Sequence, residues 1–136
     1  MERYLGLDVG ERTIGLAVSD PLGLTAQGLT TIMRTSNKED YEKVKEYIDK
    51  YNIKTLVVGL PYNMNGTQGP SAERAKKFAE KLKNKYQLEI IYQDERMTTM
   101  SAERVLIEAG MRREKRKAHI DKIAAVFILQ AFLDSK

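Results

Sequence analysis

The chain has 136 residues, no cysteine, one histidine and a formal net charge of +4. This length suits one compact domain, so we expect a single domain over residues 1–136. The composition excludes disulfides, thiolate metal sites and a zinc centre built from several histidines. The surplus of basic residues permits an anionic partner without requiring one. No charged and apolar leader precedes the first strand, so a cytoplasmic location is the default expectation.

The segment YLGLDVGERTIGLAVSD, residues 4–20, predicts two strands around a short turn. Because successive side chains of a strand point to opposite sides, one face is bulky and the other is small. The bulky face carries Leu5, Leu7, Val9, Ile14, Leu16 and Val18. Asp8 stands on the small face among glycines, which often mark the close approach of a ligand or another backbone. Asp8 is therefore either a functional carboxylate or a capping group beneath a tightly packed helix.

Helices and strands alternate in the rest of the chain. In order, we expect a strand at 24–34, a helix at 35–52 with a capping box at Ser36 and Glu39, a strand at 54–61, a loop at 62–70, a helix from Ser71 to Tyr86, a strand at 88–93, a helix at 98–110, a basic loop and a helix at 118–133. This order predicts an α/β fold with a five-stranded mixed sheet flanked by helices. Three strands are antiparallel, and two parallel strands are added by helical crossovers. The last helix is apolar on nearly all sides but too short to span a bilayer, so we expect it to be buried.

Three carboxylate positions are candidates for chemistry: Asp8, the Asp94–Glu95 pair after the last strand, and Asp121 in the first turn of the final helix. Each has an ordinary explanation as well. The helix dipole favours an acid such as Asp121, and Arg96 could pair with an exposed acid at the strand end. Carboxylates without histidine or cysteine suit Mg²⁺ or Mn²⁺. Such clusters commonly hold two metal ions that hydrolyse phosphodiester bonds.

A run of basic residues directly precedes Asp121. It consists of Arg112, Arg113, Lys115, Arg116 and Lys117. Such a run is often a solvated loop. Its position next to a candidate catalytic acid favours the alternative, in which these residues hold the phosphates of a nucleic acid.

Three blocks together carry a resemblance that covers essentially the whole chain: GLDVGERTIGLAVSD, then VVGLPYNMNGTQGPSAERA with YQDERMTT, and IDKIAAVFILQAFL. The chain resembles the YqgF/RuvX family of ribonuclease H-like nucleases. This resemblance implies a ribonuclease H-like fold and a role in maturing the 5′ end of pre-16S ribosomal RNA. The same family has also been described as a Holliday junction resolvase.

The resemblance also implies roles for individual residues. Asp8, Glu95 and Asp121 would be the catalytic acids that bind Mg²⁺ or Mn²⁺. The wider superfamily often has an acid at the end of the fourth strand, where this chain reads GLP, and this leaves Asp94 as a rival to Glu95. The residues implied to position substrate or support the site are Arg12, Asn63, Arg96 and Thr98.

Other functions are compatible with parts of the pattern. Junction resolution needs two active sites and hence a homodimer, whereas RNA processing is open to a monomer. Precursor ribosomal RNA is the preferred partner and branched DNA the alternative. A non-catalytic RNA-binding assembly factor would keep the basic surface without turnover. The first strand also resembles the phosphate-loop strand of actin-like and sugar-kinase folds, but those ATPases need two such domains and a longer chain.

Overall fold

Five strands and three helices make up the part of the chain that the structure describes. The computed structural model describes residues 2–61, 69–94 and 113–136, with side chains from residue 122 onward in the last range. The elements are β1 (Tyr4–Val9), β2 (Thr13–Ser19), β3 (Ala26–Met33), α1 (Asn37–Lys50), β4 (Thr55–Leu60), α2 (Pro70–Tyr86), β5 (Glu89–Asp94) and α4 (Arg113–Asp134). Within these ranges, no helix combines the length and apolar character that a membrane crossing requires.

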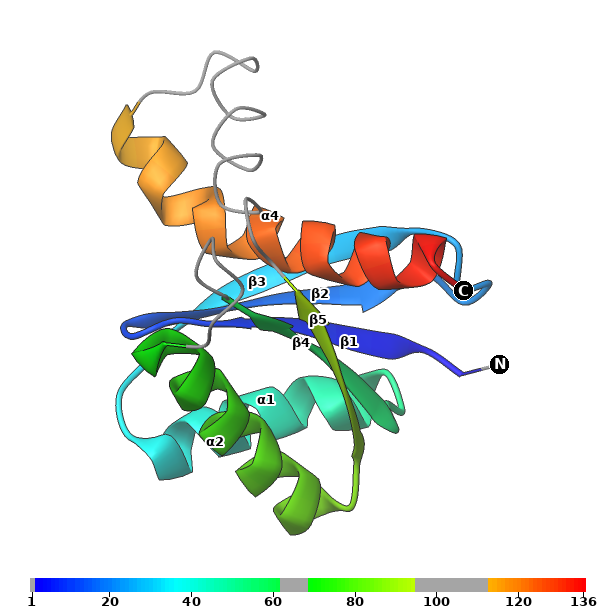
Figure 1. Cartoon of the computed structure of the whole chain (residues 1–136), viewed down its shortest axis with the longest axis horizontal. Helices are drawn as coiled ribbons and strands as arrows, with labels where there is room; N and C mark the ends of the chain where they lie inside the picture. The colour runs from blue at the N-terminus through cyan, green and yellow to red at the C-terminus, as the bar shows by residue number, and fades with distance from the viewer. Residues whose placement is uncertain (1, 62–68, 95–112) are drawn as a thin grey trace.

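The strands form one mixed sheet in the order β3-β2-β1-β4-β5 (Figure 1). β1, β2 and β3 pair antiparallel, whereas β4 is parallel to both β1 and β5. The predicted sheet is therefore confirmed. Leu7 pairs with Val58, and Val58 pairs with Tyr92. The carboxyl ends of β1, β4 and β5 consequently lie at one edge of the sheet, which we call the carboxyl edge.

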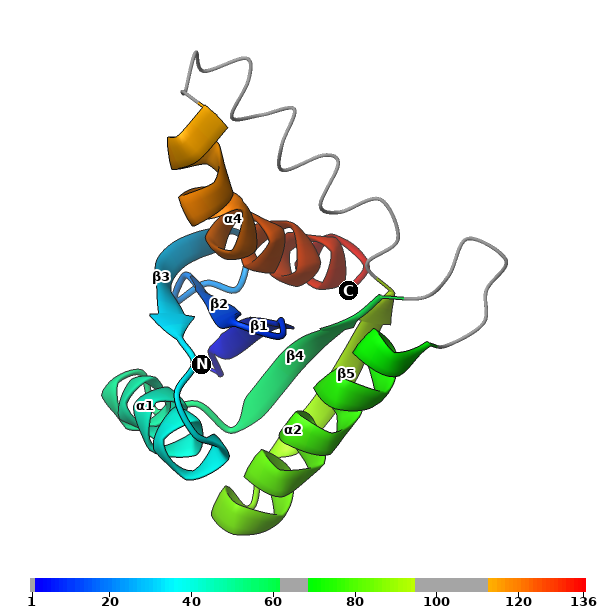
Figure 2. The same cartoon turned by 90° about the vertical axis from the view of Figure 1, so that its left-hand side faces the viewer.

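Helices cover both faces of the sheet. α1 and α2 lie against one face and α4 against the other (Figures 1 and 2). The larger core lies on the α1–α2 side and includes all six residues predicted for the bulky face of the first hairpin. A smaller core on the α4 side contains Ala17, Val57, Ala125, Ile128, Leu129 and Leu133. β4 lies between the two cores, and all six of its residues are buried.

Local signals set the start of α1 as predicted. Ser36 is the N-cap, and its Oγ accepts a hydrogen bond from the backbone N–H of Glu39 at 3.2 Å. This bond satisfies one of the donors that a helix leaves unpaired at its first turn. Helix α1 is thereby fixed directly after β3, and its buried Val44 and Ile48 enter the larger core.

The start of α4 differs from the prediction. The helix begins at Arg113, so the basic residues from Arg113 to Lys117, which were expected in a loop, lie on its first turns. Arginine and lysine are good helix formers, so this segment favours a helix without apolar periodicity. Asp121 is consequently two turns inside the helix and not in its first turn. The helix dipole acts within the first turn, so it does not explain this acid.

Candidate active site

Asp8 lies near the end of the central strand β1 and is half-buried. It follows Leu7, whose partner on β4 is Val58. The next residue of β4 is Gly59, which has no side chain to fill the space between β1 and β5. Asp8 therefore stands at the carboxyl edge beside a position that leaves room for another group.

The two faces of β5 separate Asp94 from Asp8. Ile90 and Tyr92 pack on the α1–α2 core, whereas Ile91 packs on the α4 core. Because side chains alternate along a strand, Asp94 belongs to the face of Ile90 and Tyr92. Asp8 belongs to the opposite face, that of Gly6 and α4. The strand geometry thus disfavours Asp94 as the partner of Asp8.

The close approach of α4 accounts for one glycine of the small face. A Cβ on Gly6 would lie 2.9 Å from the Cβ of Leu129 and 3.1 Å from the carbonyl oxygen of Ala125. A side chain at this position would displace the helix. The alternative in which a helix packs tightly on this face is therefore correct for Gly6, and Asp8 lies two residues further along the same face.

α4 runs toward the carboxyl edge as it is followed back to its N-terminus. Near its C-terminal end, Gln130 Oε1 accepts a hydrogen bond from the backbone N–H of Ala26 at 2.9 Å. Earlier in the helix, the stem of Lys122 lies over Gly28. β3 has the same direction as β1, since both are antiparallel to β2. The backbone of Asp121 therefore lies toward the edge at which β1 reaches Asp8.

The turn between β1 and β2 is held in place by Arg34. Its Nη1 donates to the carbonyl oxygen of Gly10 at 2.8 Å, and its backbone N–H donates to the carbonyl oxygen of Arg12 at 2.9 Å. Its Nε donates to Asp40 Oδ2 at 3.0 Å, within an ion pair whose carboxylate is only 1% exposed. Arg12 is itself exposed and lines a pocket of about 560 Å³ together with Arg34 and Arg74. The exposed Arg12 is consequently carried by a fixed backbone.

Sequence reasoning missed this Arg34–Asp40 pair. A signal was present, because an arginine directly before a helix and an aspartate in its first turn are close in sequence. The sequence analysis assigned no role to that aspartate. Only the tertiary structure shows that the arginine also reaches the β1–β2 turn.

The other predicted site residues divide into two groups. Arg113, Lys115, Arg116, Lys117 and Asp121 lie on the backbone of α4. Asn63, Glu95, Arg96, Thr98 and Arg112 lie outside the described residues. Over the side chains that the structure does describe, no three histidine, cysteine, aspartate or glutamate residues come together as a metal site. Two of the three predicted ligands, Glu95 and Asp121, are not among these side chains.

The fold is shared with known junction resolvases of the ribonuclease H-like class. Thermus thermophilus RuvC in complex with a Holliday junction superimposes with a TM-score of 0.61 at 16% identity, covering 99% of this chain and 96% of that one. The fowlpox virus Holliday junction resolvase gives 0.57 at 16% identity, with 98% and 99% covered. At this level of identity, the similarity establishes the fold.

Sequence comparison then identifies the family. The model of the RuvX family, described as Holliday junction resolvase, matches residues 2–135. Relatives named "Putative pre-16S rRNA nuclease" include one from Thermoanaerobacter pseudethanolicus, 55% identical over 98% of this chain and 97% of its own. Another from Clostridium botulinum strain Hall is 53% identical over the same shares. The chain belongs to the RuvX family.

Proposed function

We propose that this chain is a single-domain nuclease that hydrolyses phosphodiester bonds in the 5′ region of precursor 16S ribosomal RNA. The observation that carries the proposal is the half-buried Asp8 at the carboxyl edge, on the face toward which α4 brings Asp121. Family membership and the names of the close relatives support the same activity.

Asp8, Glu95 and Asp121 are the proposed ligands of Mg²⁺ or Mn²⁺. Their oxygen donors fit a hard divalent cation, and the chain has no cysteine and one histidine to favour a softer metal. Glu95 is preferred to Asp94 because Asp94 belongs to the face opposite Asp8. When bound, two such ions would activate water and stabilise the leaving oxygen.

The remaining proposed residues bind and orient the substrate. Arg12 stands on the turn that follows β1, where a guanidinium can pair with a phosphate in a two-pronged contact. The basic residues from Arg112 to Lys117 precede Asp121 and would neutralise the phosphates that approach the acids. Asn63, Arg96 and Thr98 are proposed to position the strand, which fixes the scissile bond relative to the acids.

The test is metal-dependent cleavage by wild type and Asp8→Asn. Substrates are a precursor ribosomal RNA fragment, an unstructured single-stranded RNA and a four-way DNA junction. We expect wild type to cut the precursor, and Asp8→Asn to lose about a thousandfold in rate, because a metal-binding carboxylate supports several kcal/mol of transition-state stabilisation. The control is Asp49→Asn, which removes an exposed carboxylate that pairs with Lys45 on α1. Equal rates for the two variants would refute the role of Asp8.

Junction resolution is the second candidate, and it is favoured by the description of the family. A resolvase must cut two symmetric strands, so it would act as a homodimer. Cutting confined to the four-way junction, by a dimeric protein, would favour this candidate over RNA processing. Binding of the precursor RNA without cutting of any substrate would favour a non-catalytic assembly factor.

A further inference from the structure

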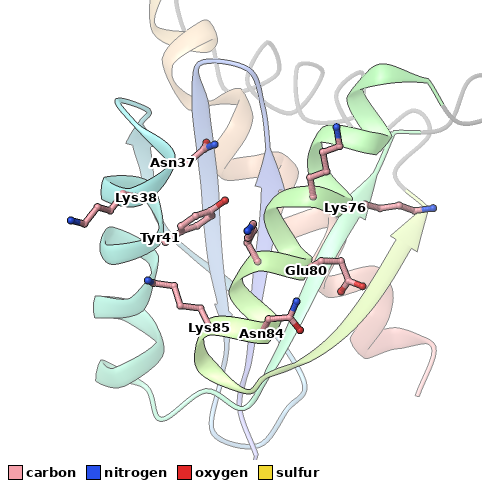
Figure 3. A pocket seen from close by; sticks show the side chains of 9 residues that line it. Asn37, Lys38, Tyr41, Lys76, Glu80, Asn84 and Lys85 are labelled. Atoms are coloured by element: carbon pink, nitrogen blue, oxygen red, sulfur yellow. The ribbon is translucent and has the colours of Figure 1, made fainter.

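A groove lined with lysines runs between α1 and α2, on the face of the sheet opposite α4 (Figure 3). It has a volume of about 940 Å³. Its cationic residues are Lys38 from α1 and Lys76, Lys77, Lys81 and Lys85 from α2. We call it the lysine groove. None of these lysines belongs to the site at the carboxyl edge.

The positive charge of the groove is poorly compensated. Among the described residues that line it, Glu80 is the only carboxylate. Within the described part of the chain, no ion pair involves Lys77 or Lys81. Lys77, Lys81 and Lys85 follow one another at intervals of four, and like charges at this spacing destabilise a helix slightly. We call Lys77, Lys81 and Lys85 the stripe. It contributes nothing to the stability of α2 through charge pairing, and it concentrates positive potential along one line of the helix.

The walls of the groove are fixed. The rings of Tyr41 on α1 and Phe78 on α2 pack with their centroids 4.9 Å apart. Phe78 is buried in the larger core, and Tyr41 packs against that core as well. Figure 3 shows Tyr41 projecting from α1 toward α2. The spacing between the two helices is thus set by core packing, so the lysines are presented on a rigid scaffold.

The groove continues toward the β1–β2 turn. A second pocket shares Tyr41 and Lys77 with the lysine groove and adds Arg34 and Arg74. The pocket of Arg12 in turn shares Arg34 and Arg74 with this second pocket. Cationic side chains therefore line a connected path from the turn after β1 to the C-terminal end of α2, and this path also contains Glu11, Glu73 and Asp40, the last of which pairs with Arg34.

We infer that the lysine groove binds the sugar-phosphate backbone of the RNA substrate on one side of the cleavage site. This inference rests on the proposed nuclease function and extends it to a second contact region. From Arg74 to Lys85, α2 rises by about 16 Å, since each residue of a helix adds about 1.5 Å. Successive phosphates of one strand are about 3.4 Å apart along a duplex, so this length faces several of them.

The residue types favour a backbone contact without reading of bases. Lysine presents a mobile point charge that follows a phosphate, whereas base recognition uses planar, fixed donors and acceptors. Contacts of this kind set the position of a nucleic acid on the protein. The groove would therefore hold the flanking RNA in register while the acids at the carboxyl edge act on the scissile bond.

The experiment compares two triple variants in an Asp8→Asn background, which separates binding from cleavage. K77Q/K81Q/K85Q removes the stripe. K50Q/K54Q/K83Q removes three equally exposed lysines that line neither the lysine groove nor its two connected pockets. In each triple, one lysine also lies over a tyrosine ring, Lys85 over Tyr86 and Lys50 over Tyr51. Affinity for a fluorescently labelled precursor ribosomal RNA fragment is measured from 50 to 200 mM KCl.

We expect the slope of log affinity against log salt to fall by about two for the groove triple, because each lost phosphate contact removes about 0.7 to 0.9. Over this salt range, the affinity of the Asp8→Asn parent would then drop about 15-fold more than that of the groove triple. The control triple should keep nearly the whole slope. Equal slopes for the two triples, or an unchanged slope for the groove triple, would overturn the inference. Failure of the nuclease proposal is separate, since it is read from cleavage by the chain with Asp8 intact.

Discussion

On the α1–α2 side of the sheet, β1 presents Leu5, Leu7 and Val9 to the larger core, whereas on the α4 side the same strand presents Gly6 and Asp8. Burying large apolar side chains contributes about 25 cal/mol per Å² removed from water, so the first face supplies most of the stability. The second face of β1 buries less apolar area, because Tyr4 packs on the smaller core while Gly6 and Asp8 add little. In exchange, the backbone of α4 approaches closely and a carboxylate stands at the carboxyl edge. One strand thus separates stability from the proposed chemistry by the alternation of its side chains.

The substitution with the largest expected effect on the free energy of unfolding is Leu5→Ala. Leu5 is fully buried in the larger core, and its truncation leaves a cavity, so we expect a loss of about 3 kcal/mol in the free energy of unfolding. Denaturant unfolding measures this loss. At low temperature, where the variant remains folded, its cleavage rate should stay within about twofold of wild type, because repacking on this face leaves the carboxyl edge in place. A large loss of cleavage in the folded variant would show that the two faces of β1 do not separate stability from the proposed chemistry.

The neighbouring change Gly6→Ala tests the other face. Its new Cβ would meet the backbone of Ala125, so α4 must shift by a few tenths of an ångström. We expect a loss of about 1–2 kcal/mol in unfolding free energy, smaller than for Leu5→Ala. Cleavage should nevertheless fall by about tenfold, because α4 carries Asp121 and small misplacements of reacting groups are costly. Kinetic assays on the folded variant check this expectation. A cleavage rate of the variant equal to that of wild type would show that the position of α4 is not critical.

These two faces were predictable from the sequence because a period of two is easy to recognise in the first hairpin. The capping box at Ser36 was predictable for a similar reason, since its partners lie within one helical turn. The start of α4 was not, because a charged helix end lacks apolar periodicity. The link from Arg34 to Gly10 joins residues 24 positions apart, so only the fold reveals it. The face of β5 to which Asp94 belongs also needed the structure, since Ile90, Ile91 and Tyr92 are apolar on both faces of this strand.

A third region, the loop between β2 and β3, lies at the end of the sheet opposite the carboxyl edge. Asp20 Oδ1 accepts hydrogen bonds from the backbone N–H groups of Leu24 at 2.7 Å and Thr25 at 2.9 Å. These bonds, that from Thr25 first, lower the pKa of Asp20 below its usual value of 3.8. A lowered pKa means that the carboxylate favours the folded loop above pH 3.8, and that this contribution is lost as the pH falls through the folded value.

We therefore expect the amide NMR signals of Leu24 and Thr25 to titrate with a midpoint below pH 3.8, and to lose this transition in Asp20→Asn. The effect on global stability is the smallest of the three, because Asp20 lies on the surface and water competes for its bonds. Cleavage near neutral pH should be the same for wild type and Asp20→Asn, since residue 20 is distant from the carboxyl edge. A midpoint at or above 3.8 would contradict the assigned hydrogen bonds. Reduced cleavage in the variant would instead show that the two ends of the sheet are coupled. Stability of the β2–β3 loop and cleavage at the carboxyl edge would then not be independent.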